Sequence, residues 1–285
     1  MRFTTPLRYP GGKGKLSQFV EKLLTLNGME AIHYAEPYAG GAGLALNLFF
    51  KKLSSDIYLN DINPAVYAFW HSVLNESDAL CKLIKNTDVT IDEWYRQKEI
   101  MSMPHNHDLL HLGFSTFFLN RTNRSGILKG GVIGGKNQDG QWKLDARFNK
   151  DNLITRISRI SDRKDSIHLF NMDASDFLES VVKNLPTNSL TYLDPPYYIK
   201  GKGLYENHYS HEDHQHIAKK VTSEISTPWI VSYDNVPEIN EMYKNVNSIM
   251  YGINYSAQHR YKGSEVMYFS ESLLLPKSIE ILKSK

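Results

Sequence analysis

The sequence predicts an α/β fold, in which a parallel sheet carries helices on its faces and a mostly helical segment is inserted into it. Short apolar strands alternate with helices in the first 75 residues, which is typical of the βαβ arrangement of a parallel sheet. The pattern turns helical over residues 76–120, and short apolar strands resume at residue 167. We therefore expect a main domain of residues 1–75 and 166–285, with residues 76–165 inserted into it.

Apolar runs and their flanking residues predict the individual elements. Pro64 suits the first turn of a helix, and the glycines before Gly43 mark a turn from a strand into a helix. The expected strands are residues 31–36, 56–60, 167–170, 189–193, 228–232, 247–251 and 265–269. Outside residues 76–120, the expected helices are residues 43–52, 64–74 and 150–160.

The insert contains a segment rich in glycine, asparagine, serine and basic side chains at residues 121–141, which predicts a glycine-rich loop or hairpin. Residues 119–165 hold eleven Lys and Arg against five Asp and Glu, in a chain whose net charge is +2. A basic insert in a weakly acidic body suits a polyanion such as nucleic acid. Charge alone would favour the simpler interpretation of a solvated face.

Composition excludes several classes of protein. The chain is 41% hydrophobic and 22% charged, which argues against wholesale disorder, and no apolar run approaches the ~20 residues of a membrane helix. One cysteine, Cys81, leaves no internal disulfide and no cysteine zinc cluster. His211 and His214 lie near Asp213, but they open a polar helix, so we expect no metal. These features predict a soluble, cytoplasmic protein.

The strongest chemical motif is Asp194-Pro195-Pro196-Tyr197, which directly follows an apolar strand. Ligands bind beyond the carboxyl ends of strands in open α/β sheets. The two prolines stiffen the backbone, and the Asp194 carboxylate and the Pro195 carbonyl are both acceptors beside the ring of Tyr197. Two acceptors beside a ring match a planar base with an exocyclic amine. The alternative is a proline-stiffened turn with a surface aspartate.

Two further motifs point to a nucleotide-like ligand. The first is the Glu36–Gly43 segment (EPYAGGAG), which joins a strand to a helix and contains three glycines that allow close backbone approach. Asp61 follows Gly40 by 21 residues, where an acid holds ribose hydroxyls in nucleotide-binding sheets. The second motif is a Pro-Gly-Gly turn that presents Lys13 near a helix start, and alone it is most often simply a turn.

In this order the motifs resemble the Dam-type adenine-N6 DNA methyltransferases of class alpha, over nearly the whole chain. That family has Pro-Gly-Gly-Lys first, then the glycine-rich cofactor loop, the target-recognition insert and Asp-Pro-Pro-Tyr. The resemblance implies a Rossmann-like sheet that uses S-adenosylmethionine, with an inserted target-recognition domain. It also implies methyl transfer to N6 of an adenine flipped out of double-stranded DNA.

The resemblance assigns roles to individual residues, and the basic insert supplies candidates for DNA contact. The catalytic residues it implies are Asp194, Pro195 and Tyr197. The cofactor-binding residues it implies are Tyr9, Lys13, Tyr38, Gly40, Gly43, Asp61, Asp173 and Asp194. The expected DNA-binding residues are Asn120, Arg121, Arg124, Lys129, Lys136 and Arg147.

Several alternatives stay open. Related Asn/Asp-Pro-Pro-Tyr sites act on RNA bases and on protein glutamine, and a DNA-binding relative without turnover would keep the basic insert. The family's GATC specificity does not carry over, because Ser125–Gly135 does not match the GATC-reading hairpin. The enzyme could be a solitary, nucleoid-associated methylase or the partner of a restriction endonuclease that acts on the same site.

Three weaker candidates complete the list. The Ser232–Asn235 segment ends an expected strand and is predicted to shape the pocket. Tyr209 either walls that pocket or packs nearby, and Arg260 either meets a phosphate or pairs with Glu265.

Overall fold

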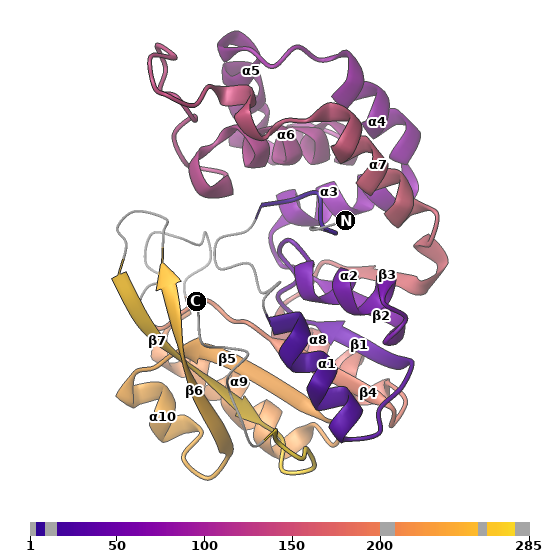
Figure 1. Cartoon of the computed structure of the whole chain (residues 1–285), viewed down its shortest axis with the longest axis vertical. Coiled ribbons are helices and arrows are strands. Elements are labelled where there is room, and N and C mark those ends of the chain that lie inside the picture. The colour runs from indigo at the N-terminus through magenta and orange to yellow at the C-terminus, as the bar shows by residue number, and fades with distance from the viewer. Residues whose placement is uncertain (1–3, 9–15, 200–208, 256–260, 277–285) are drawn as a thin grey trace. The chain divides into compact units, whose positions relative to one another are not determined.

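The chain divides into two compact units, described here by a computed structural model (Figure 1). The first unit comprises residues 1–12 and 61–171, and the second comprises residues 13–60 and 172–285. The structure describes residues 4–8, 16–199, 209–255 and 261–276.

Six of the seven strands found among the described residues belong to the second unit. They lie in the order β2-β1-β4-β5-β7-β6, with β2, β1, β4 and β5 parallel and β7 antiparallel to both β5 and β6. Their bounds are β1 Ile32–Glu36, β2 Ser54–Asn60, β4 Ser189–Leu193, β5 Trp229–Asp234, β6 Asn247–Tyr255 and β7 Tyr261–Phe269.

Helices flank the strands of this unit, and each start follows local rules. A capping box begins α9, where Ser210 and Asp213 exchange side-chain and backbone hydrogen bonds. Pro237 opens α10, the position at which proline's missing N–H costs least. The bounds are α1 Leu16–Leu26, α2 Gly43–Phe50, α8 Ala174–Ser180, α9 His211–Glu224 and α10 Pro237–Met242.

The first unit is mostly helical among its described residues and contains the remaining strand, β3 (Ile167–Phe170). Helices α3 and α6 pack closely, because a Cβ on Gly113 of α6 would lie 2.5 Å from the Ala68 carbonyl oxygen of α3. The helices are α3 Pro64–Asn75, α4 Ser77–Asn86, α5 Ile91–Ser102, α6 Leu109–Thr122 and α7 Lys150–Ser161.

The structure confirms the predicted α/β fold, and most boundaries lie within two or three residues of their expected positions. The strands at residues 167–170 and 189–193 have the expected bounds, whereas β6 and β7 are longer. The first unit includes all of residues 76–165, whose role as a target-recognition insert stays a prediction. No helix within the described ranges is long and apolar enough to cross a membrane.

Candidate active site and nucleic-acid interface

Asp194 lies directly after β4, at the point where the chain leaves the sheet. All five residues of β4 are buried, so the carboxylate lies at the carboxyl edge of a central strand. The Ser232 hydroxyl on β5 donates a hydrogen bond to Asp194 Oδ1 at 2.8 Å. The Tyr192 hydroxyl lies 2.7 Å from Ser232 Oγ. These bonds orient the carboxylate that the sequence predicts will meet the substrate.

Two acids hold the residues that follow. Asp234 at the end of β5 accepts the backbone N–H groups of Tyr198 and Ile199, at 3.0 and 3.1 Å. The Tyr197 hydroxyl donates to Glu265 Oε1 on β7 at 2.5 Å. Both acids and Tyr197 are buried. The segment is therefore fixed by β5 and β7 as well as by its prolines, which supports the interpretation that Ser232–Asn235 shapes this site.

The glycine-rich turn between β1 and α2 is tied together at its two ends. Glu36 Oε1 accepts the backbone N–H of Ala45 in the first turn of α2 at 3.0 Å, and the Tyr34 hydroxyl at 3.1 Å. Burial raises the pKa of Glu36 to about 8, although these two hydrogen bonds act in the opposite direction. Gly40 has a φ of +46°, a conformation that favours glycine. The turn is tight and its backbone conformation is defined.

Tyr38 and Tyr209 meet beside this turn. Their hydroxyl oxygens are 2.9 Å apart and their rings meet edge to face. Tyr209 therefore has a defined partner in the glycine-rich turn, and burial raises its pKa to about 12. Gly43, the last glycine of the motif, forms the first residue of α2. Of the other expected cofactor residues, Tyr9 and Lys13 lie outside the described residues, as does Arg260.

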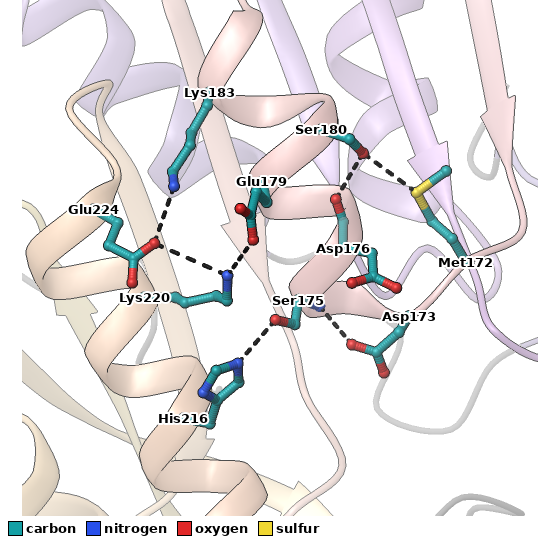
Figure 2. A network of polar contacts seen from close by, with 10 residues as sticks. All are labelled: Met172, Asp173, Ser175, Asp176, Glu179, Ser180, Lys183, His216, Lys220 and Glu224. Atoms are coloured by element: carbon teal, nitrogen blue, oxygen red, sulfur yellow. Dashed lines mark hydrogen bonds and ion pairs between the residues drawn. The ribbon is translucent and has the colours of Figure 1, made fainter.

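Asp173 is the N-cap residue of α8 (Figure 2). Its Oδ1 accepts the Ser175 backbone N–H at 2.7 Å, which caps the helix. The Ser175 hydroxyl lies 3.0 Å from His216 Nε2 on α9, and Lys220 of α9 pairs with Glu179 of α8 at 2.7 Å. These contacts fix α8 against α9, and the start of α8 carries Asp173 at a defined position.

Asp61 belongs to the first unit and directly follows β2 in the chain. Its Oδ1 accepts the backbone N–H of Asn63 at 2.9 Å, and its carbonyl accepts Asn171 Nδ2 at 2.7 Å. Its own N–H donates to the Phe170 carbonyl at 3.3 Å. The carboxylate is thus oriented by the turn that leads into α3.

The six expected DNA-contacting residues fall into two groups in the first unit. Asn120 is 1% exposed, and its amide bonds the backbone of Arg8 and the carbonyl of Gly126. Arg121 donates through Nε to the Arg147 carbonyl at 2.7 Å. The other four have exposed side chains: Arg124, Lys129, Lys136 and Arg147.

The side-chain amides of Asn123 and Gln138 brace the loop that carries these cations. Asn123 Nδ2 donates to the carbonyls of Ile127 and Leu128, and its Oδ1 accepts the Trp94 indole N–H at 2.7 Å. Gln138 Nε2 donates to the Ile133 and Gly135 carbonyls, at 2.8 and 2.6 Å. The loop has one isolated antiparallel bridge among its described residues, between Asn123 and Val132. It is therefore a braced loop rather than a regular hairpin.

Sequence patterns assigned no role to Asn123 or Gln138, and they treated Glu265 only as a partner for Arg260. The one signal for Glu265 was an acid within an apolar strand sequence. Asn123 and Gln138 gave no signal, because amides are ordinary residues in a glycine-rich surface loop.

Comparison with known protein families shows to which family the chain belongs. Residues 9–257 match the model of the D12 class N6 adenine-specific DNA methyltransferases. The chain belongs to this family. Its members are the adenine-specific class that the motif order resembled.

A curated relative is "Modification methylase StsI" of Streptococcus sanguinis, which is 27% identical over 207 residues. The match covers 68% of this chain and 29% of the relative's length, so the chain spans less than a third of that protein.

Similar solved structures include an rRNA methyltransferase, aviRa, of Streptomyces viridochromogenes (TM-score 0.40, 12% identity, 90% of this chain and 84% of that one). Another is precorrin-6y C5,15-methyltransferase of Geobacter metallireducens (TM-score 0.35, 9% identity, 88% and 86%). At these TM-scores, nothing about the site or its substrate rests on either likeness.

Proposed function

We propose that this chain transfers a methyl group from S-adenosylmethionine to N6 of an adenine flipped out of double-stranded DNA. The observation that carries the proposal is the segment from Asp194 to Tyr197, which β5 and β7 hold at the carboxyl end of β4. Membership of an adenine-specific DNA methyltransferase family supports the same reaction class.

The segment suits a flipped adenine. Adenine N6 lies inside a duplex, and rotating the nucleotide out costs a few kcal/mol. Tyr197 would offset part of that cost, because stacking a base on an aromatic ring is worth ~1–3 kcal/mol. The Asp194 carboxylate and the Pro195 carbonyl would accept the two N6–H groups. A base without an exocyclic amine, such as thymine, would leave both acceptors unpaired, so the same contacts favour a base that carries one.

The same hydrogen bonds also make N6 a better nucleophile. The N6 lone pair is conjugated with the ring, and bonds from N6–H to Asp194 and Pro195 favour a pyramidal nitrogen whose lone pair is available. S-adenosylmethionine would supply the methyl group: its S–CH3 bond breaks as the N6–CH3 bond forms, the neutral thioether S-adenosylhomocysteine leaves, and N6 loses one proton to solvent. The residues of this chain then have to position and polarise the reactants, and no covalent enzyme intermediate is needed.

The residues around the glycine-rich turn fit this cofactor. Gly40 at φ +46° allows the backbone to approach a ligand closely, and Tyr38 is held by Tyr209. We propose that Asp61 accepts the ribose hydroxyls and that Asp173 lies near the cofactor adenine. Their carboxylates are oriented by backbone N–H groups. The remaining proposed cofactor contacts are Tyr9, Lys13, Gly43 and Asp194.

DNA contact is proposed for the basic loop, residues 121–141, and for a cluster of arginines around Arg121. Burial, together with the nearby charges of Arg8, Arg156 and Arg147, lowers the pKa of Arg121 to about 9. A phosphate would relieve this mutual repulsion, because its charge compensates several guanidinium groups at once. Arg124, Lys129, Lys136 and Arg147 would meet DNA directly, whereas Asn120 would act by shaping the loop.

We also propose that the recognised site is one that a paired restriction endonuclease would cut, because the curated relative is a modification methylase. Genomic methylation without any endonuclease gene nearby would instead indicate a solitary enzyme. The recognition sequence itself must come from experiment.

Expression in a host that lacks DNA methylation tests the proposal. Sequencing that detects N6-methyladenine should find one modified motif in the host genome, and none in cells that express Asp194→Ala. Absence of modification, with folded protein that binds S-adenosylmethionine, would overturn the proposal. Methyl incorporation into RNA or protein from the same cells would then identify the substrate.

A further inference from the structure

Glu265 is a buried acid that binds the residue proposed to stack the target adenine. It is 1% exposed, and both of its carboxylate oxygens accept tyrosine hydroxyls. Tyr197 donates to Oε1 at 2.5 Å, and Tyr251 on β6 donates to Oε2 at 2.7 Å. Burying a carboxylate is costly unless hydrogen bonds compensate, so the two donors explain how the acid is tolerated here.

Sheet register brings this group to the site. Glu265 on β7 is paired with Asp234 on β5 and with Tyr251 on β6. Directly opposed residues in antiparallel strands project from the same face, so these three side chains form a row across the sheet. Asp234 holds the backbone after Tyr197, and Glu265 holds the Tyr197 hydroxyl. The two acids thus fix different parts of one segment.

We propose that Glu265 is a positioning residue that sets the ring plane of Tyr197 for the flipped adenine. A tyrosine side chain has two rotatable bonds, and a fixed hydroxyl position restricts rotation about the first, the Cα–Cβ bond. A phenolic O–H prefers to lie in the plane of its ring, so the direction of its acceptor, Glu265 Oε1, also favours one ring plane. The prolines and Asp234 act on the backbone, whereas the contact with Glu265 acts on the side chain itself. The inference rests on the proposed function, because the ring orientation matters only if a base stacks on it.

Tyr197→Phe tests the contact directly, because it keeps the ring and removes the hydroxyl. We expect kcat for methylation of a duplex containing the recognised site to fall about tenfold, since a hydrogen bond to a charged group is lost. The KM for S-adenosylmethionine should stay within twofold. The fluorescence of 2-aminopurine at the target position, which reports a flipped base, should change in the same variant.

Variants of the acid separate positioning from a structural role. Glu265→Leu should lower kcat about as much as Tyr197→Phe, whereas Glu265→Gln keeps one acceptor oxygen and should restore part of the loss. The double variant Tyr197→Phe with Glu265→Leu should be no slower than the slower single variant, because both changes remove one interaction. If Glu265→Leu does not fold, Tyr197→Phe and Glu265→Gln still decide the question.

Tyr243→Phe is the matched control. Tyr243 is also buried in the second unit, and its hydroxyl makes no hydrogen bond to any residue that the structure describes. Its loss should leave kcat unchanged. Wild-type kcat in both Tyr197→Phe and Glu265→Gln, or effects that multiply in the double variant, would overturn the positioning role while leaving the proposed function intact. A wild-type protein that transfers no methyl group to DNA would overturn both.

Discussion

Two irregular segments carry the proposed functions, one in methyl transfer and one in DNA contact. The hydrogen bonds that hold them come from different places: from neighbouring strands in the first segment and from the loop's own side chains in the second. The segment from Asp194 to Ile199 is fixed by buried acids and a hydroxyl on neighbouring strands, through Ser232, Asp234 and Glu265. The basic loop of the first unit is fixed from within by neutral amides of Asn123 and Gln138, which bond the loop's own carbonyls.

This difference follows from what each segment has to hold. The first presents a few polar groups whose orientation decides the reaction, so each has its own partner in the sheet. The second presents exposed cations, whose attraction to phosphate is shared among many contacts. This attraction requires an ordered loop backbone but no individual partner for each cation. Single substitutions should therefore have large effects in the first segment, and small ones among the cations of the second.

Asp194→Ala should have the largest effect. Removing the proposed acceptor of the adenine amine should lower kcat at least a hundredfold, the scale seen when one preorganised transition-state contact is lost. Affinity for duplex DNA should change by less than about threefold, since the basic loop is untouched. A methyl-transfer assay and a gel-shift titration measure the two quantities. Near-normal turnover would show that the site is elsewhere.

Glu36→Gln should change the pH dependence of stability. The pKa of Glu36 is raised from 4.5 to about 8, so between these values the folded chain keeps a proton that the unfolded chain has released. Its contribution to stability is complete below pH 4.5 and is lost as the pH rises to about 8. At ~1.4 kcal/mol per pKa unit, this amounts to a few kcal/mol.

Chemical denaturation at pH 5 and pH 8 measures this contribution. Glutamine keeps the shape and an acceptor oxygen but cannot ionise, so the difference in unfolding free energy between the two pH values should shrink in the variant. Glu30→Gln, at an exposed position, is the control and should leave the difference unchanged. An unaltered pH profile in Glu36→Gln would contradict the raised pKa.

The fold was largely predictable because its signals are local. Apolar runs located the strands at residues 167–170 and 189–193, whose neighbours in the chain end them sharply. The β6–β7 pair was underestimated, because its pairing continues through polar residues such as Gly252 and Ser264. Backbone hydrogen bonds extend these strands beyond the apolar core, and hydrophobic patterning does not report such pairing.

The candidate site was predictable only in part, because strand pairing also brings together side chains that are distant in the sequence. Asp194 and Tyr197 stand together in one motif, but Glu265 lies 68 residues after Tyr197. Only the register of β7 between β5 and β6 brings it to the ring. Asn123 likewise looks like any polar loop residue until its contact with Trp94, 29 residues earlier, is known. The sequence therefore indicates the proposed reactive groups and the Ser232–Asn235 segment beside them, but it misses Glu265 and Asn123.

Asn123→Ala should show how far DNA binding by the basic loop depends on the hydrogen bonds that brace the loop. The change removes the hydrogen bonds of Asn123 to the Trp94 indole N–H and to two loop carbonyls, which costs about 1–3 kcal/mol of stability. DNA affinity should fall more than after loss of any single exposed lysine, although Asn123 is neutral and buried. Asn137→Ala, at an exposed position of the same loop, is the control for thermal unfolding and DNA titration.

Lys129→Ala should have the smallest effect on DNA affinity. It tests most directly whether the basic loop, unlike the Asp194 segment, spreads its binding over many contacts. If its exposed ammonium meets a phosphate, the slope of log affinity against log salt should become shallower by about one, with a few-fold loss of affinity. The loss should be equal for specific and unrelated duplexes, because phosphate contacts carry no sequence information. Lys219→Ala, an exposed lysine of the second unit, is the matched control and should leave the slope unchanged. A loss confined to the recognised sequence would instead make Lys129 a base-reading residue, and the basic loop would then resemble the Asp194 segment in depending on individual contacts.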